Sequence, residues 1–193
     1  MAADDLLTSE SSPLRVDWVP LEGVPGLVHT GGGLGMTFLP GKQHDGRKGR
    51  HRRDLGIDLA RLRGEHGVDA LLVLVEDQEL EATGVPDIAT ACAAHGIELL
   101  RFPVPDVDVP ADRAAFGARL DQCRERVAAG KRVAVACLGG LGRTGTAVAC
   151  LLVDAGLEAD AAIRLTRETR HGTIETAAQE SFVRAWRASP GSR

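Results

Sequence analysis

The feature that most constrains the fold is the stretch VAVACLGGLGRTGTAVACLL, residues 133–152, in which two apolar runs enclose a glycine-rich turn. The first run is typical of a buried strand, and the second of a helix. Glycine at positions 139, 140 and 142 leaves the turn almost without side chains, while Cys137 and Arg143 stand at its two ends. In open α/β sheets such a turn lies at the carboxyl ends of the strands, where ligands bind. The stretch therefore predicts an α/β fold with a ligand site at the carboxyl end of the strand that precedes the turn.

The rest of the chain alternates strand-like and helix-like segments. Besides 132–136, strand-like composition marks residues 14–21, 34–40, 70–76 and 97–104. Helices are expected at 54–67, 86–96, 111–130, 158–169 and 175–188, and one follows the glycine turn. This alternation predicts an α/β fold, with a mostly parallel central sheet flanked by helices on both faces. We expect a flexible polar arm at residues 1–12 and a single domain over 13–190.

Composition excludes several other classes of protein. With 44% hydrophobic and 26% charged residues the chain is globular, and no apolar run approaches the ~18 residues of a membrane helix. The acidic start MAADDLLTSE differs from a signal peptide, so we expect a cytoplasmic protein with no membrane partner. A net charge of −4 and 3% aromatic residues argue against nucleic-acid binding. Three of the four cysteines (Cys92, Cys123 and Cys150) lie in apolar helical contexts and are expected to be inert core residues.

Two nucleotide-binding motifs fail to match the glycine turn. A P-loop needs G-x-x-x-x-G-K-[ST], but here Arg143 replaces the lysine and Cys137 replaces the first glycine. A dinucleotide fingerprint does not fit either, and the second glycine cluster TGGGLGMT (30–37) has Met36 at its last glycine position. A purely structural turn would pack helix on strand around a buried cysteine and would leave Arg143 unexplained.

An anion cradle with a reactive thiol fits every position of the turn. The glycines let consecutive N–H groups point inward, and the following helix adds the positive end of its dipole. Arg143 can hold two phosphate oxygens with its planar fork. The same field stabilises a thiolate at Cys137, since lowering a thiol pKa from ~8.5 to below ~7 takes about 2 kcal/mol. Thr144 could donate a hydrogen bond to the sulfur when it leaves.

The segment Cys137–Thr144 resembles the Cys-(five residues)-Arg-[Ser/Thr] signature of the cysteine-dependent protein phosphatases. It is most similar to the kinase-associated phosphatase (cyclin-dependent kinase inhibitor 3-like) branch of the dual-specificity group. The similarity extends upstream and downstream, through residues 34–41, 52–74, 84–106 and 170–186. This resemblance implies a protein tyrosine phosphatase-like fold, a phosphorylated protein or peptide as substrate, and no cofactor or metal.

The chemistry also needs a proton donor, because the departing oxygen must be protonated and water must later be activated. Two aspartates of the loop RFPVPDVDVPADR are candidates, Asp106 and Asp108, and the resemblance places the acid at Asp106. It further implies that Gln179 positions the hydrolytic water, while Arg170 is expected to anchor the loop structurally. The catalytic set is then Cys137, Arg143, Asp106 and Thr144, and the phosphate-binding set is Leu138, Gly139, Gly140, Leu141, Gly142 and Arg143.

One departure from the family pattern keeps other functions open. Most relatives place a histidine directly before the cysteine, where this chain has Ala136. A phosphate-binding module without turnover is therefore an alternative, and a rhodanese-like sulfurtransferase is a third. The basic run 42–54 is expected to be a solvated face or to steer an acidic substrate. The preference among phosphotyrosine, phosphoserine and phosphothreonine, and the oligomeric state, do not follow from the sequence.

Overall fold

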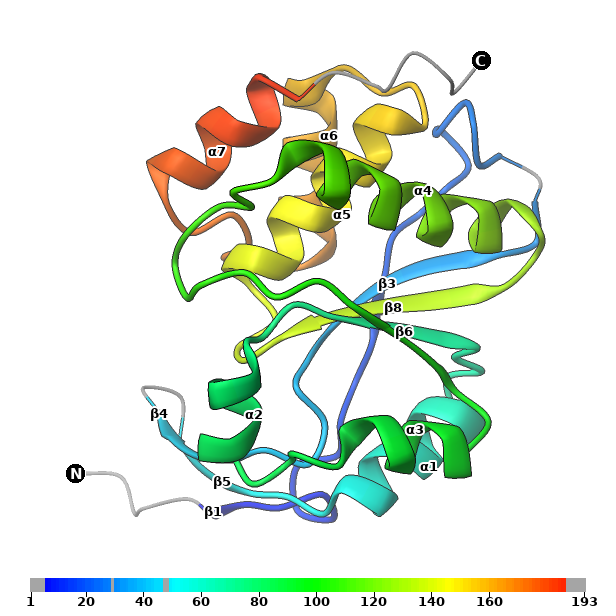
Figure 1. The fold of residues 1–193 in the computed structure, drawn as a ribbon. Coiled ribbons are helices and arrows are strands. Elements are labelled where there is room, and N and C mark those ends of the chain that lie inside the picture. Colours follow the sequence, from blue (N-terminus) through cyan, green and yellow to red (C-terminus); the bar gives the residue numbers. More distant parts are fainter. Residues whose placement is uncertain (1–5, 29, 47–48, 187–193) are drawn as a thin grey trace.

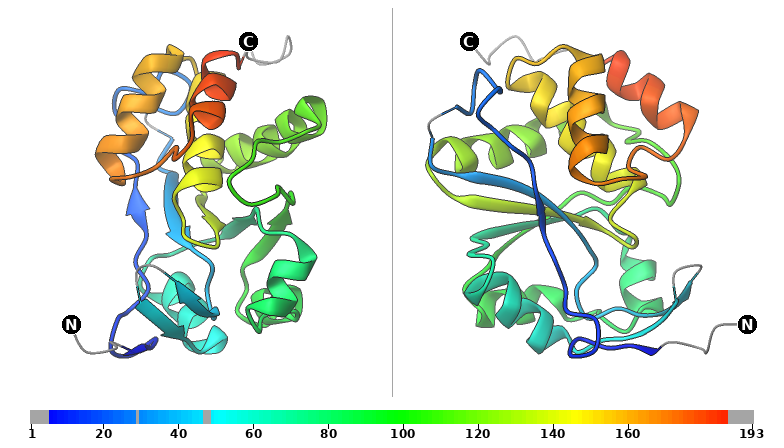
Figure 2. Two further views of the ribbon diagram at one scale, coloured as in Figure 1. Left: turned by 90° about the vertical axis from the view of Figure 1, so that its left-hand side faces the viewer. Right: turned by 180° about the vertical axis from the view of Figure 1, so that it is seen from behind.

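The computed structural model describes residues 6–28, 30–46 and 49–186. A five-stranded sheet crosses the middle of the molecule (Figures 1 and 2). Its strands, in spatial order, are β2 (Asp17–Trp18), β3 (Gly33–Phe38), β8 (Arg132–Cys137), β6 (Ala70–Val73) and β7 (Glu98–Arg101). Only the edge strand β2 is antiparallel to its neighbour. The predicted α/β fold with a mostly parallel sheet is confirmed.

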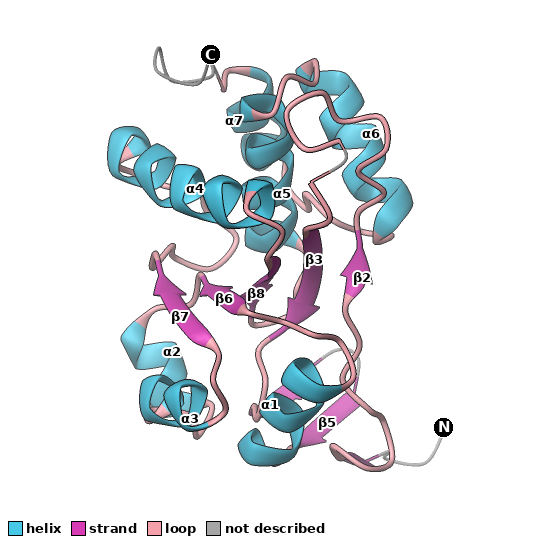
Figure 3. Cartoon of the chain, turned by 90° about the vertical axis from the view of Figure 1, so that its right-hand side faces the viewer, coloured by secondary structure: helices cyan, strands magenta, loops and turns pink. Residues whose placement is uncertain are grey.

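Helices cover both faces of the sheet (Figures 1 and 3). One face carries α4 (Arg113–Ala128), α5 (Gly142–Asp154), α6 (Ala159–Thr169) and α7 (Ala177–Arg184), and the other carries α1 (Leu55–Gly64), α2 (Asp77–Ala82) and α3 (Ile88–Ala94). Nearly every residue of α5 is buried, because this helix packs on β3 and β8 and is itself covered by α4, α6 and α7. Its apolar sequence is thus that of a central helix. Along the described ranges, no helix combines the length and the apolar character that crossing a membrane needs.

A second, small sheet lies at the end of the molecule where the chain begins. It consists of β1 (Leu6–Leu7), β5 (Gly49–Arg52) and β4 (Gln43–Gly46) in that order. The sequence predicted neither this sheet nor α2. Residues 1–5 of the expected arm lie outside the described residues, whereas the part from Leu6 onward is held by strand pairing with β5. Ser9 is fully buried and exchanges hydrogen bonds with the backbone of Asp54, a contact that the polar composition of the arm did not show.

Strand β8 positions the glycine turn. It lies between β3 and β6, all three run parallel, and Val133–Cys137 are buried. Cys137 is the last residue of this strand, opposite Phe38 at the end of β3. The turn therefore leaves the sheet at its carboxyl edge and enters α5 at Gly142, as the sequence predicts.

Candidate active site

Three carbonyl groups of the loop between β8 and α5 accept hydrogen bonds from the protein around it. The Leu138 carbonyl accepts from Nζ of Lys42 at 2.9 Å, and the Gly139 carbonyl accepts from Nη2 of Arg170 at 3.4 Å. The Leu141 carbonyl accepts from the N–H groups of Gly145 and Ile174. Among the described residues, by contrast, no acceptor takes a hydrogen bond from the N–H groups of residues 138–141. Four backbone donors beside Cys137 are thus available to an anion.

Close packing explains why glycine stands at two positions of this loop. Gly140 has φ +70°, and a Cβ atom there would lie 2.3 Å from the carbonyl oxygen of Thr37. A Cβ atom at Gly142 would lie 2.6 Å from a carboxylate oxygen of Glu175. Gly139 has open space around the corresponding position. The glycines at 140 and 142 therefore let the loop approach β3 and the segment before α7.

Cys137 lies at the base of this loop and is 3% exposed. The first turn of α5 follows it, so the positive end of a thirteen-residue helix faces the same region. The Thr144 hydroxyl in that turn is fully buried, and among the described residues it has no hydrogen-bond partner. Thr144 is thus close in the chain to the sulfur, but the bond between them that the sequence suggested is not made in this structure.

Arg143 is buried, and its guanidinium lies between two acidic side chains. Nη1 donates to Glu79 at 2.6 Å and to the Val104 carbonyl at 2.9 Å. Nη2 donates to Glu79 at 2.9 Å and lies 2.8 Å from Oδ1 of Asp106. Nε is buried and has no partner among the described residues. Burial by itself lowers the pKa of Arg143, but the hydrogen bond to Glu79 and the nearby Cys137 sulfur and carboxylates outweigh it and raise that pKa.

Glu79, in α2, is the residue of this site that the sequence analysis missed. Its carboxylate binds Arg143 through both oxygens, a bidentate pair that fixes the plane of the guanidinium. One of those oxygens also accepts from the N–H of Glu76 and so caps α2. Burial by itself raises the pKa of Glu79, but the hydrogen bonds from Arg143 and Glu76 outweigh it and hold that pKa below its ordinary value. The only signal in the sequence is the pair of glutamates three residues apart after a buried strand, which also fits a plain helix cap.

The loop between β7 and α4 distinguishes the two candidate acids. The carboxylate of Asp106 reaches Arg143 and its side chain is still 65% exposed. The carboxylate of Asp108 accepts from the N–H of Val109, so it caps its own turn. Between them Val107 has φ +57°, a strained conformation for a β-branched residue, and is 61% exposed. The geometry brings Asp106 to the cradle and leaves Asp108 in a turn-capping position.

Gln179, in α7, lies against Gly142 of α5 and the loop between β7 and α4. It is fully buried, and its amide nitrogen donates to the Asp108 carbonyl at 3.3 Å. Its amide oxygen accepts from the N–H groups of Glu175 and Thr176 at the start of α7. A Cβ atom at Gly142 would meet both of its amide atoms. Gln179 thus contacts Gly142 of the cradle, and its water-positioning role stays a prediction.

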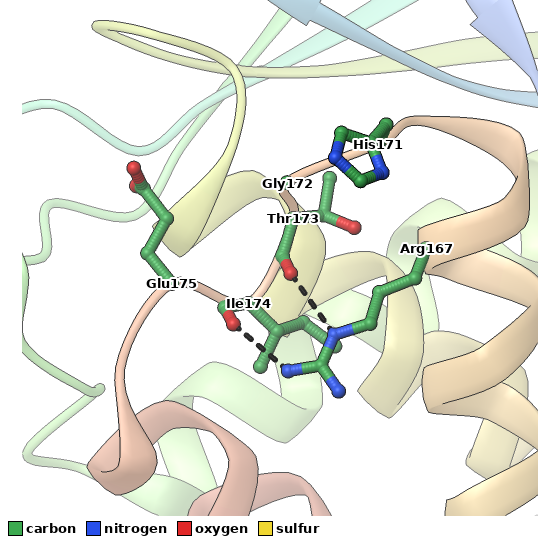
Figure 4. A pocket seen from close by; sticks show the side chains of 6 residues that line it. All are labelled: Arg167, His171, Gly172, Thr173, Ile174 and Glu175. Carbon is green, nitrogen blue, oxygen red and sulfur yellow. Dashed lines mark hydrogen bonds between the residues drawn. The ribbon is translucent and has the colours of Figure 1, made fainter.

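A cavity of about 400 Å³ lies beside the cradle, in the turn between α6 and α7. Figure 4 shows the guanidinium of Arg167 reaching across this turn to the carbonyl groups of Thr173 and Ile174. The turn also contacts the loop, since the Ile174 N–H donates to the Leu141 carbonyl. The six residues that line the cavity are Arg167, His171, Gly172, Thr173, Ile174 and Glu175.

The basic run 42–54 is only partly a solvated face. Lys42 and Arg53 are buried, and Arg53 forms an ion pair with the equally buried Asp58. Arg52 pairs with Asp45 at 2.6 Å on the surface of the small sheet. Positions 47 and 48 lie outside the described residues. Steering of an acidic substrate by this run stays a prediction.

The other three cysteines are buried away from this loop, in α3, α4 and α5. Burial raises the pKa of Cys92 to about 11 and that of Cys123 to about 12, and it raises the pKa of Cys150 well above its ordinary value. All three therefore remain thiols at neutral pH, as expected of core residues.

Comparison with known proteins identifies the family of the chain. A family model, Swiss Army Knife protein, DSP-PTPase phosphatase domain, matches residues 51–183. Cyclin-dependent kinase inhibitor 3 of Rattus norvegicus is 27% identical over 188 residues, which cover 96% of this chain and 82% of the rat protein. The structure of kinase-associated phosphatase with its catalytic cysteine changed to serine has a TM-score of 0.78 at 24% identity, over 89% of this chain and 93% of the other. The active form of Tk-PTP has a TM-score of 0.63 at 29% identity, over 78% and 88%. The resemblance found in the sequence is confirmed.

Proposed function

The chain belongs to the DSP-PTPase phosphatase family, and on this premise we propose that it is a cysteine-dependent phosphoprotein phosphatase. Its substrates would be phosphotyrosine residues and also phosphoserine or phosphothreonine residues of a protein or peptide. The observation that carries the proposal is the polarity of the loop beside Cys137. The carbonyls of Leu138, Gly139 and Leu141 accept hydrogen bonds from the surrounding protein, while the N–H groups of residues 138–141 have no acceptor among the described residues. A phosphoryl group fits such a set of donors.

The proposed reaction has two steps. The Cys137 sulfur attacks phosphorus, the phosphorus–oxygen bond to the substrate breaks, and Asp106 gives its proton to the departing oxygen. A water then attacks the phosphocysteine, passes a proton to the Asp106 carboxylate, and inorganic phosphate leaves as the sulfur–phosphorus bond breaks. Arg143 and the loop amides hold the phosphoryl oxygens in both steps. Gln179, beside Gly142, is the group proposed to orient the water.

A phosphate-binding module without turnover is the second candidate. Ala136 favours it, because a buried methyl group stands directly before Cys137 and offers no hydrogen bond to the loop. The rhodanese-like alternative has less support, since sulfur transfer has no use for an acid placed as Asp106 is, against Arg143.

The test compares the wild type with Cys137→Ser on p-nitrophenyl phosphate and on thiosulfate. We expect phosphate release by the wild type, a phosphorylated Cys137 after rapid acid quench, and no thiosulfate sulfurtransferase activity. The serine variant should still bind tungstate, because the donors of the cradle are backbone groups. Tungstate binding without phosphate release by the wild type would support the binding module. Serine-variant turnover within about tenfold of the wild type would exclude Cys137 as nucleophile.

The substrate class is tested with one peptide sequence carrying phosphotyrosine, phosphoserine or phosphothreonine at the same position. Release of phosphate from all three, in a ratio of kcat/KM values that stays within about 100-fold, supports dual specificity. Hydrolysis of the phosphotyrosine peptide alone restricts the proposal to tyrosine.

A further inference from the structure

We infer that Lys42 and Arg170 are positioning residues for phosphate binding, because they hold two peptide groups of the Cys137 loop with their N–H bonds turned inward. The inference deepens the proposed function and rests on it. From the sequence, Lys42 belongs only to a basic run, and Arg170 is expected to anchor the loop without a named partner. The structure gives both a specific target, two successive carbonyl groups of one loop.

The geometry of the peptide unit connects the outside of the loop to the inside. In a trans peptide the carbonyl of one residue and the N–H of the next lie in one plane and point in opposite directions. The carbonyl of Leu138 therefore fixes the direction of the Gly139 N–H, and the carbonyl of Gly139 fixes that of Gly140. Each cation on an outer carbonyl thus determines where one of the unpartnered N–H groups points.

These peptide groups need such support because they adjoin glycine. Gly139 has no side chain and open space around it, so packing does not restrict its backbone. Rotation of either peptide would turn a carbonyl oxygen toward the phosphate site and remove one donor. A cation held at the outer carbonyl opposes that rotation. It also polarises the peptide and makes its N–H a stronger donor.

The surrounding fold buries Lys42 and holds its ammonium group against the loop. It lies between β3 and β4, it is 5% exposed, and its ammonium group is 4.6 Å from the centroid of the Phe38 ring. A buried ammonium needs strong partners, and the Leu138 carbonyl at 2.9 Å is one of them. The neighbouring imidazole of His51 does not add a charge, since burial and then the positive charges of Lys42 and Arg53 lower the pKa of His51 to about 4.

Arg170 reaches the loop from the opposite end of the sequence. Nη1 pairs with Asp17 of β2 at 2.6 Å, and this contact directs Nη2 toward the Gly139 carbonyl. Arg167 stabilises the turn that follows Arg170, because its guanidinium donates to the carbonyl groups of Thr173 and Ile174 in that turn (Figure 4). Arg170 is therefore held at both its side chain and its backbone. Its 3.4 Å bond is longer than that of Lys42, so we expect a smaller effect from its loss.

The experiment measures tungstate affinity and the alkylation of Cys137 in Lys42→Met, Lys42→Arg and Arg170→Gln, with the exposed Lys131→Met as control for the loss of one positive charge. We expect Lys42→Met to weaken tungstate binding about tenfold and Arg170→Gln about threefold, as for the loss of one oriented hydrogen bond. KM should rise more than kcat falls. The rate of iodoacetamide alkylation of Cys137 at neutral pH should fall, because the loop N–H groups beside the sulfur are no longer held in place. Lys42→Arg should restore most of the affinity, and Lys131→Met should leave it unchanged.

The outcomes separate this inference from the proposed function. An unchanged tungstate affinity in folded Lys42→Met, with turnover still dependent on Cys137, overturns the inference and leaves the phosphatase proposal intact. Weaker tungstate binding in Lys42→Met together with a wild type that releases no phosphate supports the positioning role and contradicts the phosphatase. A loss of thermal stability without a change in affinity or in the alkylation rate would mean that both residues only stabilise the fold, and it also overturns the inference.

Discussion

Oδ1 of Asp106 lies 2.8 Å from Nη2 of Arg143, so the proposed acid contacts the proposed phosphate clamp. Glu79 binds the other side of the same guanidinium, and the Val104 carbonyl takes the remaining hydrogen of Nη1. Only Nε is without a partner among the described residues. A phosphate that binds Nε and Nη2 together must therefore displace Asp106 from Nη2, while Glu79 can stay in place. In the proposed reaction, binding of the substrate would therefore release Asp106 from Arg143 and leave it free to move toward the leaving group.

This relationship predicts that Asp106→Asn binds phosphate analogues more tightly while turnover falls. The amide has no charge to compete for Nη2, so tungstate should bind a few-fold more tightly. Turnover of phosphopeptides should fall about 10²–10⁴-fold, as for the loss of a general acid. Aryl phosphates with good leaving groups should be affected less. Isothermal titration with tungstate and a series of aryl phosphates measure the two effects.

The control is Asp108→Asn, since Asp108 caps its own turn and does not reach Arg143. It should leave tungstate affinity unchanged and keep the dependence of rate on the leaving group. If Asp108→Asn and not Asp106→Asn produces the leaving-group effect, the acid is assigned to the wrong aspartate.

A second prediction concerns the fork of Arg143. Lysine at this position keeps the charge but cannot bind Glu79 through two parallel hydrogen bonds and offer a further donor to phosphate. We expect kcat/KM to fall at least about 100-fold, comparable to the loss of one transition-state donor. Steady-state kinetics on p-nitrophenyl phosphate measure this, with circular dichroism to verify the fold. Near-normal kinetics would show that one positive charge is sufficient.

The sequence predicted the central sheet because the apolar patterns of its strands are compatible with few other structures. The apolar runs 70–76 and 132–136 can be buried only inside a sheet with helices on both faces, and they became β6 and β8. The small sheet has no such pattern. Strand β5 reads Gly-Arg-His-Arg and pairs antiparallel with β4, which is polar as well, and on its other side it pairs with Leu6–Leu7, more than forty residues away. Polar and basic residues give these strands little strand propensity, and the pairing with β1 is a tertiary contact, so the basic run gave no sign of the sheet.

The same distinction applies to the site. Cys137 and Arg143 are six positions apart in one turn, and this spacing alone indicates a thiol nucleophile beside a phosphate-binding guanidinium. Glu79 and Lys42 act on that turn from other parts of the chain, at separations of 64 and 96 residues. A glutamate in a short acidic helix and a lysine in a basic run have many ordinary explanations. Only the fold shows which group each of them binds.

Two neighbouring glycines of the loop provide a matched pair for a third prediction. Gly140→Ala would put a methyl group 2.3 Å from the Thr37 carbonyl oxygen in a conformation with φ +70°. The loop must then move, so we expect a loss of about 1–3 kcal/mol of stability and the loss of measurable tungstate binding. Gly139→Ala meets open space and should stay within about 1 kcal/mol of the wild-type stability. Urea unfolding and tungstate titration of both variants test this. Equal behaviour of the two variants would contradict the packing of Gly140 on β3.

The last prediction concerns a buried carboxyl group far from the loop, Asp154 at the end of α5. Burial raises the pKa of Asp154 to about 6, the nearby Asp121 adds to the rise, and the hydrogen bond from Nε1 of Trp186 and the charge of Arg124 oppose it. Because the folded-state pKa lies above the ordinary value, the group favours folding while it is protonated in both states. That contribution is lost as the pH rises from about 4 to about 6, where the unfolded chain ionises first.

Asp154→Asn should therefore stabilise the protein at neutral pH and not in acid. The asparagine oxygen can still accept the hydrogen bond of Trp186, and the variant has no buried charge. A shift of about two units corresponds to at most about 3 kcal/mol, so we expect a gain of about 1–3 kcal/mol in the free energy of unfolding at pH 7.5. The gain should disappear by about pH 4, where both residues are neutral. Urea unfolding at several pH values measures it, with the exposed Asp87→Asn as control for the same change of charge. A gain that is equal at both pH values would mean that Asp154 does not titrate between them, and that packing at Trp186 explains the effect.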